Sequence, residues 1–153
     1  MQQLSLKIVP LAQLAIAITL MWLLSQHFPI LPFYLNENGF FCVSLIVTGL
    51  LIMLAGVMAF YYQETTVDPR DPSKASSLVV AGIYRYSRNP MYLGMAIVLV
   101  GVAFMLANLG SLLVVPIFVM SITTLQIVPE ELALEEQFGD SYREYKDKVN
   151  RWL

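Results

Sequence analysis

The sequence predicts an all-α, polytopic membrane protein with four transmembrane helices and a C-terminal cytoplasmic amphipathic helix. Of its 153 residues, 58% are apolar and only 13% are charged, whereas about 25% are charged in a typical soluble domain. The charged residues are confined to short blocks between long uncharged runs. The length is that of a single domain, and we treat 1–153 as one unit.

The uncharged runs place the membrane spans. About 20 apolar residues cross the hydrocarbon core as a helix. The runs 8–36 and 38–63 can each hold one span, and the run 89–129 can hold two, separated at the polar turn Asn108–Ser111. The expected spans are 8–26, 40–62, 91–107 and 111–127, with a kink at Pro116 in the last. The first run is too long for a cleaved signal peptide, so we expect it to be retained.

The basic residues predict the orientation. With four spans, the N-terminus, the loop 63–90 and the tail after the fourth span share one side of the membrane, and all nine Lys and Arg residues fall there. Cytoplasmic segments carry this excess, so both termini and the loop are expected in the cytoplasm. The small size and the lack of an organelle signal indicate a prokaryotic inner membrane.

Composition also disfavours two classes of partner. A net charge of −2 lacks the basic patch that nucleic-acid binding needs. A single cysteine, Cys42, and a single histidine, His27, give no cluster with metal-ligand spacing. We expect neither nucleic acid nor metal. The small-residue pairs Gly49/Gly56 and Gly94/Gly101 could pack helices within one chain or between chains.

Most polar groups lie in two segments on the cytoplasmic side, the first of which ends at the third span. Pro90 suits the first position of a helix and keeps Asn89 out of helical geometry. The N–H groups of the first turn would then attract an anionic group. By composition alone, the tyrosines and arginines here favour an interfacial belt that anchors the helix.

The second segment is the tail, where we expect a helix over 129–149 that starts at Pro129. Glu130 and Glu131 occupy its first turn, at the end of the fourth span, where carboxylates are costly without partners. Arg85, Arg88 or a ligand cation could supply them. Apolar and aromatic residues recur every three or four positions and form an amphipathic stripe: Leu134, Phe138, Tyr142, Tyr145 and Val149. Gly139 is a point where the helix could break.

Two motifs carry a resemblance to a known family. Residues 82–94 read G-I-Y-R-Y-S-R-N-P-M-Y-L-G, which resembles the G-x-Y-x-x-x-R-H-P-x-Y-x-G signature of the isoprenylcysteine carboxyl methyltransferase and phospholipid methyltransferase superfamily. Residues 130–145 read E-E-L-A-L-E-E-Q-F-G-D-S-Y-R-E-Y, which resembles its second signature, E-E-x-x-L-x-x-x-F-G-x-x-Y-x-x-Y. The resemblance covers Ser76 to the last residue.

The resemblance implies an S-adenosyl-L-methionine-dependent methyltransferase whose lipophilic substrate (an isoprenylcysteine-like carboxylate, a lipid or a small lipophile) enters from the bilayer. It implies cofactor-binding roles for Leu78, Val79, Tyr84, Asn89, Pro90, Met91, Tyr92, Glu130 and Glu131. It implies catalytic roles for Arg88, Asn89 and Glu131, with Arg85 and Tyr145 as further candidates.

This chain departs from the family pattern at two positions. Asn89 stands where the family has histidine, and an amide can hydrogen-bond but carries no proton at neutral pH. An acceptor that needs no deprotonation, such as a carboxylate, is therefore favoured. The family's substrate-binding arginine falls near Gln126, which disfavours a prenylcysteine.

Two other functions stay open. Membrane sterol reductases have a similar C-terminal architecture but bind NADPH, whose 2′-phosphate needs more basic residues than Arg85 and Arg88. A non-catalytic membrane protein is the other alternative, and Asn89 is the feature in its favour. A Rossmann-type methyltransferase is excluded because no GxGxxG motif follows a strand.

Overall fold

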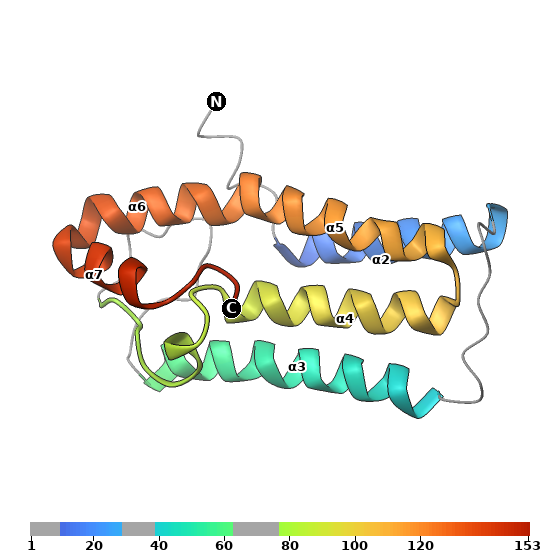
Figure 1. The fold of residues 1–153 in the computed structure, drawn as a ribbon, viewed down its shortest axis with the longest axis horizontal. Coiled ribbons are helices and arrows are strands. Elements are labelled where there is room, and N and C mark those ends of the chain that lie inside the picture. Colours follow the sequence, from blue (N-terminus) through green and yellow to red (C-terminus); the bar gives the residue numbers. More distant parts are fainter. Residues whose placement is uncertain (1–9, 29–38, 63–76) are drawn as a thin grey trace.

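The computed structural model describes residues 10–28, 39–62 and 77–153, and every regular element in these ranges is helical (Figure 1). The elements are α2 (Pro10–His27), α3 (Gly39–Tyr62), the 3₁₀ turn η2 (Gly82–Arg85), α4 (Pro90–Leu106), α5 (Leu109–Ile122), the π-helical turn η3 (Thr123–Ile127), α6 (Val128–Phe138) and α7 (Asp140–Lys148). The helices expected in the four uncharged runs are present. Residues 8 and 9 and most of the expected loop, 63–76, lie outside the described residues.

The long helices run side by side, with α4 between α3 and α5 in Figure 1. α2 packs on α5 and α4, and the shared core contains the fully buried side chains of Met21, Leu99 and Ile122. The turn η2 and the helices α6 and α7 gather at one end of the bundle, beside the start of α4. This end holds both motifs found in the sequence.

Glycines allow α3 and α4 to lie in backbone contact. A Cβ added at Gly94 would lie 2.5 Å from the carbonyl oxygen of Gly49, and one at Gly49 would lie 2.6 Å from that of Gly94. Gly101 faces the backbone of α3 at Cys42, with 3.0 Å from its added Cβ to the carbonyl oxygen. The two glycine pairs therefore pack helices within this chain, as small residues do in membrane bundles.

The turn between α4 and α5 lies where the sequence predicts it. Ala107 ends α4 in the left-handed region, at φ 48°. Asn108 caps α5: its Oδ1 accepts hydrogen bonds from the N–H groups of Gly110, at 2.7 Å, and Ser111, at 3.4 Å. Because Asn108 is the cap, α5 begins at Leu109. The residues after Asn108 that were expected in the turn therefore form the first turn of α5.

The tail differs from the single helix expected over 129–149. α5, η3 and α6 form one continuous helix, Leu109–Phe138, so no helix starts at Pro129. Pro129 has no N–H, and its ring disfavours a regular α-turn before it. The helix therefore widens into the π-helical turn η3, in which the Val128 N–H donates to the Thr123 carbonyl, five residues back. At Gly139, φ is +53°, and α7 turns away from α6.

Two described helices are long and apolar enough to cross a membrane, Gly39–Tyr62 and Leu109–Phe138, and the apolar helix α4 is shorter, at 17 residues. In α3 only 17% of the most apolar window is buried within the chain. Leu50, Leu51 and Leu54 are each more than half exposed. Such a surface is costly in water and supports the membrane character of the protein.

Candidate functional site

The first motif folds into a tight turn followed by a helix start. Gly82 has a φ of +63°, which glycine tolerates, and it opens the turn η2. Asn89 precedes Pro90, the first residue of α4, with non-helical angles, as expected. The N–H of Asn89 donates to Ser87 Oγ at 3.1 Å. Pro90 is fully buried, and a Cβ on Gly56 of α3 would contact its ring at 3.6 Å.

A hydrogen bond joins the two motifs. The hydroxyl of Tyr145, in α7, donates to the backbone carbonyl of Tyr84, in η2, at 2.7 Å. The ring of Tyr84 meets the ring of Phe60, at the end of α3, edge to face with 5.4 Å between centroids. The two motifs are far apart in the sequence and lie side by side here.

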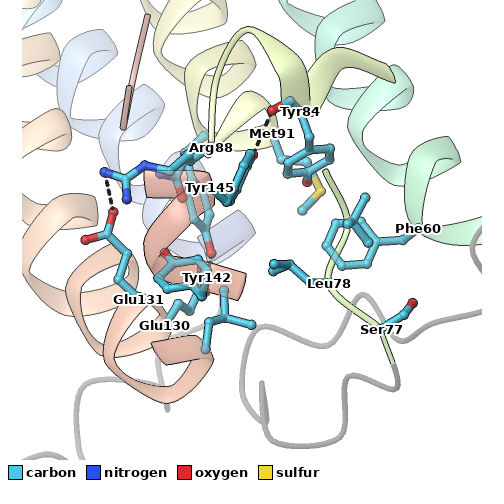
Figure 2. Close-up of a pocket in the computed structure, with 14 residues that line it drawn as sticks. Phe60, Ser77, Leu78, Tyr84, Arg88, Met91, Glu130, Glu131, Tyr142 and Tyr145 are labelled. Carbon is cyan, nitrogen blue, oxygen red and sulfur yellow. Dashed lines mark hydrogen bonds and ion pairs between the residues drawn. The ribbon is translucent and has the colours of Figure 1, made fainter. Parts of the chain in front are cut away.

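Glu131 lies between two arginines. Arg151 donates from Nε to Oε1 at 3.0 Å and from Nη2 to Oε2 at 2.6 Å. Arg88 approaches Oε1 with its Nη2 at 3.3 Å (Figure 2). The side chains of Arg88 and Glu131 are each only 10% exposed. Of the two arginines expected from the sequence, Arg88 is therefore a partner of Glu131, and Arg151 is a second partner that the sequence did not indicate.

Glu130 has a different environment. The hydroxyl of Tyr92, in the first turn of α4, donates to its Oε1 at 2.5 Å. A short contact of this kind is typical of a strong hydrogen bond between a hydroxyl and a carboxyl group. The two adjacent glutamates thus have separate partners, a phenol for Glu130 and two guanidinium groups for Glu131.

These groups surround one pocket, whose cavity volume is about 90 Å³. Ten residues proposed from the sequence line it: Leu78, Val79, Tyr84, Arg88, Asn89, Met91, Tyr92, Glu130, Glu131 and Tyr145. Pro90 does not, because it packs against α3. Arg85 is exposed and lines a separate hollow beside α7.

The pocket has an apolar side and a charged side. Phe60, Leu78 and Met91 supply apolar and aromatic surface, while Arg88 and the two glutamates supply polar and charged groups (Figure 2). The Nε and Nη1 atoms of Arg88 are buried and make no hydrogen bond to the described residues. Unused buried guanidinium donors are costly, and an anionic group on a ligand would satisfy them.

Burial keeps the tyrosines of the pocket neutral. Desolvation raises the pKa of Tyr84, and nearby Tyr145 and Glu130 add to the rise. Desolvation likewise raises the pKa of Tyr142 and Tyr145, against an opposing effect of Arg88 on both. The hydrogen bonds to Glu131 raise the pKa of Arg151. At neutral pH the phenols therefore donate hydrogen bonds or present ring faces, and Arg151 remains charged.

Among the described residues, no group of three or more His, Cys, Asp or Glu side chains could hold a metal ion.

Comparison with known proteins identifies the family. The family model described as phospholipid methyltransferase matches residues 38–141. The chain belongs to the isoprenylcysteine and phospholipid methyltransferase superfamily. No solved structure shows a significant match.

Curated relatives support the assignment. The chain is 32% identical over 111 residues to a protein-S-isoprenylcysteine O-methyltransferase of Schizosaccharomyces pombe, covering 72% of this chain and 45% of that protein. It is 30% identical over 109 residues to protein-S-isoprenylcysteine O-methyltransferase A of Arabidopsis thaliana, covering 71% and 55%. The chain thus spans about half the length of these two relatives. An uncharacterized protein of Haemophilus influenzae is 46% identical over 63 residues, which is 41% of this chain and all of that protein.

In this member of the superfamily, the two positions that depart from the family pattern are both buried. The Nδ2 of Asn89 donates to the backbone carbonyl of Arg151 at 3.0 Å, so its amide holds the chain after α7. Gln126 is fully buried in the π-helical turn and does not line the pocket.

Sequence reasoning missed five residues of the site. Phe60 lies within an expected span, and Ser77 and Leu134 were not singled out as ligand contacts. Tyr142 was placed in the amphipathic stripe and is instead buried at the pocket. Arg151 follows the second signature, and its only signal was its position on the cytoplasmic side. All but Arg151 line the pocket.

Proposed function

We propose that this chain is an S-adenosylmethionine-dependent methyltransferase that acts on a lipophilic acceptor at the cytoplasmic membrane face, and that it forms a carboxyl methyl ester. The observation that carries the proposal is that both signature motifs line the same pocket. The hydroxyl of Tyr145, from the second motif, donates a hydrogen bond to the backbone carbonyl of Tyr84, from the first. The named relatives are O-methyltransferases, which supports the reaction type.

The pocket suits the chemical groups of this cofactor. The buried Nε and Nη1 atoms of Arg88 bond to no described residue, and they suit the carboxylate of the cofactor's amino-acid part. Glu130 suits the ammonium group. The rings of Phe60 and Tyr84 suit the adenine or the sulfonium. Glu131, expected from the sequence to contact the cofactor, already forms ion pairs with Arg88 and Arg151. We assign it the role of orienting these two arginines.

When bound, the cofactor would supply a methyl group on a sulfonium, which a carboxylate acceptor can take in a direct displacement. The task of the protein is then to orient the reactants and exclude water. The apolar residues Leu78 and Met91 would exclude water, and the buried tyrosines, as neutral donors, would orient polar groups. No residue needs to remove a proton from a carboxylate acceptor, which is compatible with an amide at Asn89.

We also propose that α2, α3, α4 and α5 all span the bilayer, with the pocket on the cytoplasmic side. The two helices that are long and apolar enough, together with α4, support this arrangement. The basic residues Arg85, Arg88, Arg143 and Arg151 lie in or beside the motif-bearing end, as the positive-inside rule requires. A lipophilic acceptor would then enter from the bilayer.

The test is calorimetric titration of the detergent-purified chain with S-adenosylhomocysteine. Leu78→Trp should fill the pocket and abolish binding. Val80→Trp is the matched control, because Val80 is two residues away and exposed, and it should bind as the wild type does. NADPH should not bind, since Arg88 is the sole Arg or Lys among the described lining residues. Absence of S-adenosylhomocysteine binding by the wild type would refute the proposal.

A further inference from the structure

The segment 150–153, beyond the second signature, returns to the first motif. The backbone N–H of Arg88 donates to the Asn150 carbonyl at 3.0 Å, and the Asn89 amide donates to the Arg151 carbonyl at 3.0 Å. Trp152 packs against the hydrophobic core. The backbone of Arg151 is therefore held beside Asn89, at the start of α4, by contacts on both sides of it.

From this position the side chain of Arg151 binds Glu131 through two parallel hydrogen bonds, of 3.0 and 2.6 Å. This is the bidentate geometry in which arginine binds a carboxylate most strongly. Arg88 contacts the same carboxylate with one nitrogen only, Nη2, at the longer distance of 3.3 Å. Two guanidinium groups thus share one carboxylate, and the three side chains carry a net charge of +1.

Because Arg88 and Arg151 share the carboxylate of Glu131, some hydrogen-bond donors of Arg88 remain for a ligand. Because Arg151 takes the bidentate position on Glu131, the Nε and Nη1 atoms of Arg88 have no hydrogen-bond partner in the described part of the chain, although they are buried beside the pocket. Without Arg151, Glu131 would be free to bind Arg88 bidentately, and the remaining pair would have no net charge. Both effects would weaken the attraction for a negative group.

We infer that Arg151 is a positioning residue for an anion subsite: it holds Glu131 so that Arg88 keeps two donor nitrogens, Nε and Nη1, for the carboxylate of the cofactor. The inference rests on the proposed function, since the carboxylate is that of S-adenosylmethionine. Arg151 itself is not required to touch the ligand. Its effect reaches the ligand through Glu131 and Arg88.

The experiment compares two ligands that differ in one charge. S-adenosylhomocysteine has the carboxylate, and its α-carboxamide analogue replaces it with a neutral group of similar size. Dissociation constants are measured for the wild type, Arg151→Gln and Arg151→Lys by displacement of radiolabelled S-adenosylhomocysteine. Lys148→Gln is the matched control, because it removes a positive charge from the exposed surface of α7.

In Arg151→Gln, the dissociation constant for S-adenosylhomocysteine should rise about tenfold, as expected for the loss of an interaction with a charged group. The constant for the carboxamide should not change. Arg151→Lys should fall between, since lysine keeps the charge without the bidentate geometry. Lys148→Gln should match the wild type.

Two results would overturn the inference. An equal loss of affinity for both ligands would show that Arg151 only supports the fold, and unchanged affinity for S-adenosylhomocysteine would show that Arg88 does not depend on it. If the wild type binds neither ligand, the proposed function itself fails, which is distinguishable from both of these results.

Discussion

The hydroxyl of Tyr145 donates a hydrogen bond of 2.7 Å to the backbone carbonyl of Tyr84. One residue lies in the helix that follows the second motif's glycine, and the other in the 3₁₀ turn of the first motif. Both side chains are buried. This bond closes the pocket at the point where the two motifs meet, so its loss should affect both folding and ligand binding.

Tyr145→Phe removes this hydrogen bond and keeps the ring. We expect the free energy of unfolding to fall by about 1–3 kcal/mol, because the buried carbonyl of Tyr84 loses its donor. That corresponds to about 2–4 °C of thermal midpoint per kcal/mol in a chain of this size. Tyr86→Phe is the control: Tyr86 is 74% exposed, and its midpoint should not move. Equal midpoints for the two variants would contradict a structural role for this bond.

Tyr92 and Glu130 should be energetically coupled. Tyr92→Phe leaves the carboxyl group of Glu130 without its donor at 2.5 Å, and the loss of a buried hydrogen-bond partner costs about 1–3 kcal/mol. Glu130→Gln replaces the carboxyl group with an amide instead. If the two act as one unit, the double variant should lose less stability than the sum of the two single variants. Strict additivity in thermal unfolding would show that the pair does not interact.

The contact between α3 and α4 leaves no room for a methyl group at Gly94. Its Cβ would lie 2.5 Å from the Gly49 carbonyl oxygen, a backbone atom that cannot move aside alone. Gly94→Ala should therefore destabilise the chain by about 1–3 kcal/mol, as overpacking does. Gly39→Ala meets nothing within 4 Å and should leave the thermal midpoint unchanged. If Gly94→Ala left the thermal midpoint unchanged, the two helices would not be in backbone contact.

Asn89→Asp tests whether the amide holds the chain after α7. The substitution replaces the Nδ2 donor, 3.0 Å from the Arg151 carbonyl, with an acceptor, so two oxygens would face each other at neutral pH. We expect a loss of about 1–3 kcal/mol in unfolding free energy. The loss should diminish at acidic pH, where the protonated aspartate can again donate. A deficit that does not depend on pH would argue against a donor role for Asn89.

The arrangement of helices was largely predictable because charge is excluded from a bilayer core. The uncharged runs located α2 to α5, and Asn108 marked the turn between α4 and α5. The sequence Asn89-Pro90 located the start of α4, because proline keeps the residue before it out of helical geometry. In each case, short-range chemistry determines the structure.

The features that sequence reasoning missed depend on contacts between distant segments. The π-helical turn before Glu130 is a change of hydrogen-bond partner, from four to five residues back, that leaves hydrophobic periodicity almost unchanged. Arg151 lies twenty residues after Glu131, and a basic residue after a signature has no local mark of a partner. The sequence allows a break at Gly139, and the positive φ of this residue determines that the tail forms two helices.

The central claim is methyl transfer to a lipophilic carboxylate, and it can be measured directly. Membranes that contain the wild-type chain, or Leu78→Trp, are incubated with S-adenosylmethionine labelled in its methyl group, and lipid-soluble products are extracted. If the pocket is a carboxyl methyltransferase site, the wild type produces extractable label that mild alkali releases as methanol, and Leu78→Trp does not. Extractable label that resists alkali, or equal labelling by both proteins, would contradict it.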